Sequence, residues 1–364
     1  MSTLIAWPDS YAETYRAMRE KLGELMPEAE IRAKAELACE INLLKKQRGA
    51  VILGHNYMEP ALYHSVPDYR GDSLELSRIA ATTSGDPIIF CGVRFMAETA
   101  KILNPTRTVL IPSPRAGCSL AASITAEDVR RLRAQFPGVP VVSYVNTYAD
   151  VKAESDVCCT SGNAARVVAS LASDRVIFLP DEYLARNVAR ETGKSIIVPR
   201  VLAGAGGEDA VQGAPPGGTA DAAGAQMIGW PGRCEVHERF SVEDVTAVRR
   251  QLPDVLVLAH PECSPEVVGA ADFSGSTTAM VRYVREHPGR RYLLLTECSM
   301  ADNIAAENPT SEMVGLCSIR CPHMNEITLE DTLESLRQDR YAVEVPEAIR
   351  VRARAAVDRM ISIG

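Results

Sequence analysis

The chain has 364 residues, of which 46% are hydrophobic and 24% charged, and its formal net charge is −8. At about 150 residues per domain, this length predicts two or three domains with cores of ordinary size and excludes a miniprotein stapled by disulfides or metal. The sequence pI near 5.4 argues against a nucleic-acid partner. No apolar run approaches the roughly 18 residues that span a bilayer, so we expect no membrane association and a cytoplasmic location.

Residues 10–47 carry apolar positions at helical spacing, with a break near Pro27, which predicts an N-terminal helical arm. Beyond this arm, apolar runs of four or five residues alternate with alanine-rich helical stretches. The alternation is typical of β–α units that build a parallel sheet. A return helix is expected near 345–363.

Cysteine is common, with ten residues in the chain. Cysteines of a cytoplasmic protein should be reduced, so burial or metal ligation explains them better than disulfides. Most should pack as small hydrophobic side chains, and we expect this of Cys39, Cys91 and Cys298.

An internal repeat occurs three times. Each copy starts with an apolar strand, in AVILGHNY, VPVVSYVNT or VLVLAHPE, and ends at a cysteine, Cys118, Cys234 or Cys321. His55 lies 63 residues before Cys118 and His260 lies 61 residues before Cys321, which supports a triplication. A lone unit of roughly 80 residues buries a limited core. We therefore predict an α/β protein of three small parallel-sheet domains, related by a pseudo-threefold axis and packed around a central site.

Copy two is longer than the others, and the excess matches 203–225, where 15 of 23 residues are glycine or alanine. A segment of this composition cannot bury enough apolar area to form ordered structure, so we predict a flexible insertion. The predicted parts are a helical arm over 1–47, α/β repeats over 48–125, 126–245 and 246–330, and a C-terminal return segment with a helix over 331–364.

Polar side chains follow the first strand of every copy, and a hydroxyl opens the next helix. Ligands bind beyond the carboxyl ends of parallel strands, so we expect these side chains to meet in one pocket. A single such hydroxyl is usually an N-cap, but three helix N-termini aimed at one axis would bind carboxylates or phosphate. The strand-end residues are His55, Tyr57, Tyr144, Asn146, His260 and Glu262, and the hydroxyl residues are Ser73, Ser161, Ser276 and Thr277.

The three repeat-terminal cysteines would meet near the same axis. Three thiolates suit a [4Fe–4S] cluster with one open iron that acts as a Lewis acid. A tetrahedral zinc held by these cysteines and His237 or His323 is the competing interpretation. His237 follows Cys234 by three residues, so it should contact the bound metal or the substrate. Cys317 could form an oxidative pair with Cys321.

Taken together, the motifs resemble the quinolinate synthases of NAD biosynthesis. The resemblance spans most of the chain and is specific because many modest motifs keep the same order and spacing. The motifs are GHNY at 54–57, GDS at 71–73, AGCSLA at 116–121, YVNT at 144–147, TSGNA at 160–164, WPGRCEVH at 230–237, AHPE at 259–262, GSTTAM at 275–280 and CPHM at 321–324.

This resemblance implies a triangular fold of three α/β domains and a [4Fe–4S] cluster held by Cys118, Cys234 and Cys321. It implies that iminoaspartate condenses with dihydroxyacetone phosphate to give quinolinate, with loss of phosphate and two waters. An aspartate oxidase or dehydrogenase is the expected supplier of iminoaspartate.

The resemblance also distributes roles among the polar side chains. Glu262 is the expected base, Tyr57 the partner acid, and Tyr144 with Asn146 would close over the substrate. The implied catalytic residues are Glu262, Tyr57, Tyr144 and His237, and the implied substrate-binding residues are His55, Ser73, Tyr144, Asn146, Ser161, His260, Glu262, Ser276 and Thr277.

Three features depart from the family pattern. The insertion before Trp230 is absent from compact members, PHMNEIT follows Cys321 where members often have a Met-Ala-Met-Asn run, and the CSIRC spacing differs from the CxxCxxC of some members. Two other functions stay open. One is an aconitase-like hydro-lyase that uses the same open iron on a different hydroxy acid. The other is a non-catalytic Fe–S or oxygen sensor, which would not need the polar strand-end cluster.

Overall fold

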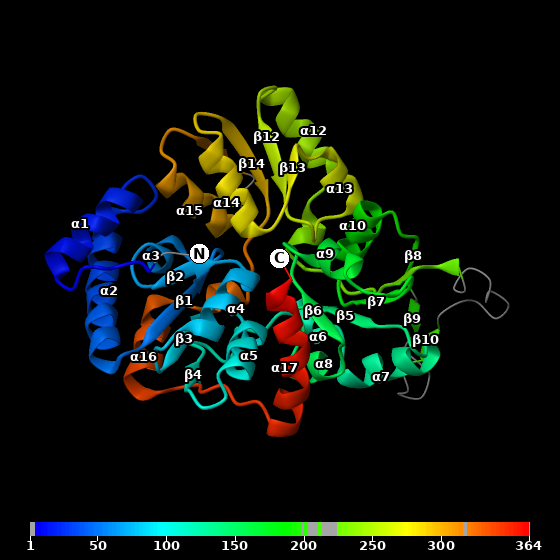
Figure 1. The fold of residues 1–364 in the computed structure, drawn as a ribbon. Helices are drawn as coiled ribbons and strands as arrows, with labels where there is room; N and C mark the ends of the chain where they lie inside the picture. The colour runs from blue at the N-terminus through cyan, green and yellow to red at the C-terminus, as the bar shows by residue number, and fades with distance from the viewer. Residues whose placement is uncertain (1–3, 199, 203–209, 213–223, 316–318, 364) are drawn as a thin grey trace.

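Three parallel β-sheets organise the structure, a computed structural model that describes residues 4–198, 200–202, 210–212, 224–315 and 319–363. Figure 1 shows the sheets and their helices arranged as a triangle around the centre of the molecule. The predicted α/β fold of three related parallel-sheet units around a central site is therefore confirmed. The boundaries proposed for these units stay a prediction.

The three sheets share one strand order. In each repeat the first strand is central, the second strand lies on one side of it, and the third and fourth lie on the other. The first sheet contains β1 (Val51–His55), β2 (Tyr69–Gly71), β3 (Ile88–Cys91) and β4 (Val109–Leu110). The second contains β5 (Val141–Tyr144), β6 (Val157–Cys159), β7 (Val176–Leu179) and β11 (Met227–Ile228), with β8 (Ile196–Ile197) added at its edge. The third contains β12 (Leu256–Ala259), β13 (Phe273–Ser274), β14 (Arg291–Leu295) and β15 (Glu312–Val314).

The central strands are buried throughout, because helices cover the sheets. Every residue of β1, β3, β5 and β7 is buried, which explains why these segments are continuous apolar runs rather than alternating ones. The covering helices are α3 (Pro60–Tyr63), α4 (Ser73–Thr82), α5 (Arg94–Leu103), α6 (Ser119–Ala122), α8 (Ala149–Ala153), α9 (Ala164–Ala169), α10 (Glu182–Thr192), α13 (Pro265–Ala270), α14 (Thr277–Glu286) and α15 (Cys298–Glu307).

The repeat continues past each terminal cysteine, because a capped helix begins at the same distance from all three. The caps Thr125, Ser241 and Thr328 each stand seven residues after a repeat-terminal cysteine. Each accepts a hydrogen bond from the backbone N–H of an aspartate three residues on. The helices that start there are α7 (Ala126–Gln135), α12 (Val242–Gln251) and α16 (Leu329–Gln338).

Helices from both ends of the chain complete the fold. The arm is α1 (Tyr11–Leu22) and α2 (Glu28–Arg48), and α2 begins directly after Pro27, where the break was predicted. The C-terminal helix α17 (Glu347–Ser362) packs against α5, α8 and β6 and so joins the first two repeats. Within the described ranges, no helix combines the length and apolar character that a membrane crossing requires.

The predicted insertion lies mostly outside the described residues. Within it, β10 (Ala210–Gln212) pairs antiparallel with β9 (Arg200–Leu202). Cys317 also lies outside the described residues, and Cys321 is a free thiol. Cys39 and Cys91 are buried free thiols, as expected. Cys298 is buried but disulfide-bonded, so the expectation of a reduced thiol was wrong there.

A buried ion pair fastens the arm to the first sheet. Lys45 Nζ on α2 lies 2.8 Å from Asp68 Oδ1, and the two side chains are 7% and 12% exposed. Asp68 Oδ2 in turn accepts a hydrogen bond of 2.8 Å from the backbone N–H of Ile52 on β1. The pair therefore connects the arm to the strand that carries His55.

We expect Lys45→Met to lower the free energy of unfolding by about 3 kcal/mol, because it leaves the Asp68 carboxylate buried without its cation. Urea unfolding monitored by circular dichroism would measure the loss. Lys46→Met is the matched control, since the neighbouring Lys46 pairs with Asp9 at the surface and both side chains are 56% exposed. That change should cost less than about 1 kcal/mol. Equal losses in the two variants would contradict the prediction.

Candidate active site

The carboxyl ends of the three sheets converge on one cavity of about 700 Å³. Each repeat contributes side chains to it, as expected for parallel strands whose ends face one axis. All predicted site residues except Ser276 line this cavity, namely His55, Tyr57, Ser73, Cys118, Tyr144, Asn146, Ser161, Cys234, His237, His260, Glu262, Thr277 and Cys321.

His55 is the last residue of β1 and His260 directly follows β12, and each makes the same backbone contact. The N–H of Tyr57 donates to His55 Nδ1 at 3.2 Å, and the N–H of Glu262 donates to His260 Nδ1 at 3.3 Å. In a neutral imidazole, an accepting Nδ1 places the proton on Nε2. Burial lowers the pKa of His55 to about 4 and that of His260 to about 3. Both rings are therefore neutral near pH 7 and offer an uncharged Nε2–H donor.

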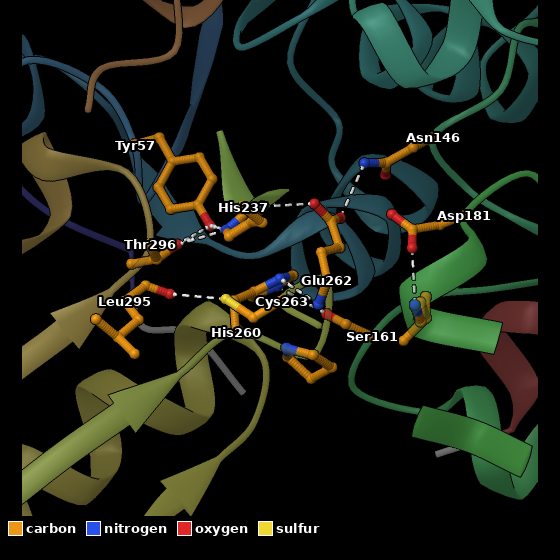
Figure 2. A network of polar contacts seen from close by, with 12 residues as sticks. Tyr57, Asn146, Ser161, Asp181, His237, His260, Glu262, Cys263, Leu295 and Thr296 are labelled. Carbon is orange, nitrogen blue, oxygen red and sulfur yellow. Dashed lines mark hydrogen bonds and ion pairs between the residues drawn. The ribbon is translucent and has the colours of Figure 1, made fainter. Parts of the chain in front are cut away.

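Glu262 is the buried carboxylate at the centre of the site (Figure 2). Tyr144 Oη donates to Glu262 Oε1 at 2.5 Å, and Asn146 Nδ2 donates to the same oxygen at 3.3 Å. His237 Nδ1 lies 2.7 Å from Glu262 Oε2, as a close polar contact rather than an aligned hydrogen bond. Burial alone would raise the pKa of Glu262, but His237, His260 and the Tyr144 hydroxyl outweigh it and hold that pKa below its ordinary value. The site thus contains a carboxylate that is ionised at neutral pH.

Tyr57 reaches the same network through Thr296. Tyr57 Oη lies 2.5 Å from Thr296 Oγ1, which lies 2.9 Å from His237 Nε2. Burial, together with the nearby Glu262 charge, raises the pKa of Tyr57 well above its ordinary value, so the phenol keeps its proton. Figure 2 shows a continuous polar path from this phenol through Thr296 and His237 to the carboxylate of Glu262.

A buried lysine fixes the loop that carries Asn146. Lys152 Nζ on α8 donates to the carbonyl of Val145 at 2.8 Å and also to the carbonyl of Thr147. These two carbonyls flank Asn146 in the chain, and Lys152 is fully buried. The ammonium therefore holds both sides of Asn146 in place against Glu262.

Three of the four predicted hydroxyl residues line the cavity. Ser73 and Thr277 are the first residues of α4 and α14, and Ser161 stands just before α9. Ser161 Oγ lies 3.2 Å from His260 Nε2. Ser276 does not line the cavity; it caps α14, and its hydroxyl donates to Asp72 Oδ2 at 2.8 Å. The ordinary N-cap role thus holds for Ser276, and its predicted substrate contact gains no support from this placement.

The three repeat-terminal cysteines face the cavity as free thiols. Burial raises the pKa of Cys118 to about 12 and that of Cys321 to about 11. It also raises the pKa of Cys234 well above its ordinary value. Thiols in such surroundings become thiolates only when a cation compensates the buried charge, which is the behaviour expected of metal ligands.

A second set of ligand atoms overlaps with these cysteines. Cys234, His237 and Glu262 each offer one ligand atom, and the three atoms lie within 4.8 Å of one another. This set could hold a single metal ion. It shares one thiol with the set predicted from the repeat.

Two residues of the polar network, both at the ends of third strands, were not predicted from the sequence. Thr296 follows β14, and Asp181 stands two residues after the end of β7. Burial and the Glu262 charge raise the pKa of Asp181 well above its ordinary value, and its Oδ1 caps α10 by accepting the N–H of Leu184 at 2.7 Å.

Known proteins are similar to this chain over nearly its whole length. A family model described as "Quinolinate synthetase A protein" matches residues 39–362. Quinolinate synthase 2 of Mesorhizobium japonicum is 50% identical over 344 residues, which covers 94% of this chain and 96% of that protein. Quinolinate synthase of Agrobacterium fabrum is 48% identical over 98% of this chain and 95% of that protein. Quinolinate synthase of Sinorhizobium medicae is 47% identical over 99% of this chain and 91% of that protein. The chain therefore belongs to the quinolinate synthetase A family.

Proposed function

We propose that this chain condenses iminoaspartate with dihydroxyacetone phosphate to form quinolinate, with release of phosphate and two waters, in the biosynthesis of NAD. The main support is the ionised Glu262, held among neutral donors in a cavity that three cysteines from three repeats also line. An enzyme that oxidises aspartate would supply the imine, and the proposal extends to functional coupling with such an enzyme.

The cavity suits substrates with two carboxylates and a phosphate. The Nε2–H groups of His55 and His260 are neutral donors, and Ser73, Ser161 and Thr277 add hydroxyls near helix N-termini. Hydrogen bonds to ionised acceptors are stronger than bonds between neutral groups. Such donors can orient anions without the cost of burying many cations beside them.

Glu262 is ionised and Tyr57 is protonated, so the two side chains can take opposite roles in proton transfer. Condensation requires removal of a proton from carbon next to a carbonyl, and the ionised Glu262 can accept it. Loss of water requires a proton for the departing hydroxyl, and the Tyr57 phenol still carries one. His237 contacts Glu262, and Thr296 contacts both His237 and Tyr57, so the base and the acid belong to one polar network.

Cys118, Cys234 and Cys321 are the proposed ligands of a [4Fe–4S] cluster. Sulfurs around one tetrahedral zinc lie about 3.8 Å apart, given a Zn–S distance of about 2.3 Å. Among the described residues, these three thiols do not form a set within 4.8 Å of one another, which favours a larger group than a single ion. When bound, the cluster would supply an open iron that acts as a Lewis acid toward a substrate oxygen.

The metal proposal predicts which thiols matter. Anaerobically purified protein should contain four irons and four sulfides per chain and should form quinolinate from freshly generated iminoaspartate and dihydroxyacetone phosphate. Cys118→Ser and Cys321→Ser should lose most of the iron. Cys39→Ser, which changes a buried thiol on α2 away from the cavity, should keep it.

Other results would change the assignment. Zinc that survives in Cys118→Ser but not in His237→Ala would favour the set of Cys234, His237 and Glu262. A full cluster without quinolinate would favour the hydro-lyase or the sensor. Turnover of another hydroxy acid would identify the hydro-lyase.

Glu262→Gln should lower kcat at least 100-fold while the protein keeps its iron, because the amide preserves the volume of the carboxylate but cannot accept the proton. Quinolinate formation and iron content should be measured on the same sample. Glu266→Gln is the matched control, since Glu266 is exposed on α13, four residues away, and its loss should change kcat less than twofold. A Glu262→Gln enzyme of normal activity would overturn the assignment of Glu262 as the base.

A further inference from the structure

A broad hollow of about 2600 Å³ adjoins the active-site cavity, and Asp72 and Ser161 line both. We propose that this hollow captures dianionic substrates through a triad of arginines, Arg78, Arg166 and Arg282, one from each repeat. The nature of the ligands rests on the proposed function. The triad itself rests on sequence spacing and on the position of the three side chains.

The triad follows the same repeat as the active site. In each copy an arginine stands five residues after the hydroxyl that lines the active-site cavity. The pairs are Ser73 with Arg78, Ser161 with Arg166, and Thr277 with Arg282. A chance arginine in one helix would need no explanation, but the same spacing in three helices places one guanidinium per unit near the pseudo-threefold axis.

All three arginines line the hollow. They stand on α4, α9 and α14, which Figure 1 shows grouped around the centre of the molecule near the end of α17. The hydroxyls of Ser161 and Ser276 line the same hollow. The hollow is therefore continuous with the helix N-termini that are proposed to bind the substrate anions.

The contacts of Arg166 and Arg282 leave positive charge for a ligand. Arg166 Nη2 donates to the carbonyl of Gly162, which is a neutral partner. Arg282 Nε lies 3.9 Å from Glu286, and both side chains are mostly exposed, so water screens this pair. Arg78 donates to the carbonyl of Ile361 at 3.0 and 3.1 Å, which anchors it beside the last turn of α17.

Carboxylates in the lining partly offset these charges. Asp72 is engaged by Ser276 and by the N-terminus of α4, and Glu75 accepts from Thr278 Oγ1 at 3.3 Å. Glu191 also lines the hollow, as does Arg190. The lining thus holds four arginines and three carboxylates, and two of those carboxylates are already hydrogen-bonded within the protein.

A chain with a net charge of −8 repels dianions at long range, so productive encounter needs a local positive field. Guanidinium groups match the planar oxygens of carboxylate and phosphate. These arginines border the hollow rather than the inner cavity, so their positive field should attract the substrate as it approaches the protein. Added salt should weaken this attraction.

The test compares two double variants with the same net charge, −10, which is −8 less two arginines. Arg166→Gln/Arg282→Gln removes two members of the triad. Arg16→Gln/Arg285→Gln removes two exposed arginines outside the hollow, one of them on the same helix α14. At ionic strength near 10 mM, the triad variant should lose about tenfold in kcat/KM for dihydroxyacetone phosphate, mostly through KM. The loss should shrink below twofold near 300 mM salt, and the control should match the unmodified protein.

Binding of inorganic phosphate, measured by isothermal titration calorimetry on anaerobic protein, gives a readout that does not depend on turnover. Phosphate should bind at least fivefold more weakly to the triad variant than to the control. If the two variants behave alike in both measurements, the capture site is wrong. If the unmodified protein makes no quinolinate but phosphate binding still depends on the triad, the proposed function fails and the capture site stands.

Discussion

The buried charge of Glu262 is the constraint on which the rest of the site depends. A carboxylate removed from water is costly unless polar or charged partners compensate it. Here the partners come from elsewhere in the chain: Tyr144 ends β5, Asn146 follows that strand, and His237 follows Cys234. The third repeat could not keep this carboxylate ionised by itself. The ionised state of Glu262 therefore depends on the packing of the repeats against one another.

The same requirement explains why buried lysines support the framework. Lys152 fixes the two carbonyls around Asn146, and Lys45 ties the arm to the strand that ends in His55. Neither ammonium lines the active-site cavity, yet each sets the position of a strand end that does. Loops after parallel strands are the flexible part of such folds, so rigid support behind them is what makes a precise pocket.

Much of the site was predictable because two observations combine. The chain contains three copies of one repeat, and ligands bind beyond the carboxyl ends of parallel strands. Aligning the first strands was sufficient to bring His55, Tyr144 and Glu262 into one pocket. Thr296 and Asp181 escaped because third strands end in different residue types in each copy, so no shared motif draws attention to them. Lys152 was missed for another reason: a lysine side chain is usually exposed to solvent, so its burial was not expected. Which of the neighbours Ser276 and Thr277 faces the cavity depends on the residue at which α14 begins. The spacing of the motifs in the sequence does not determine that residue.

Charge is arranged in two layers around the pseudo-threefold axis. The inner cavity offers neutral imidazoles and hydroxyls beside the buried carboxylate of Glu262, whereas the arginines border the outer hollow. Cations placed inside would bind substrate and product anions equally tightly, which gives no advantage to the transition state. They would also raise the desolvation cost of the pocket and would lower the basicity of Glu262 further. Neutral donors inside and guanidiniums outside thus separate attraction of the proposed substrate anions from the chemistry proposed for them, and each repeat contributes one arginine of the triad to the outer layer.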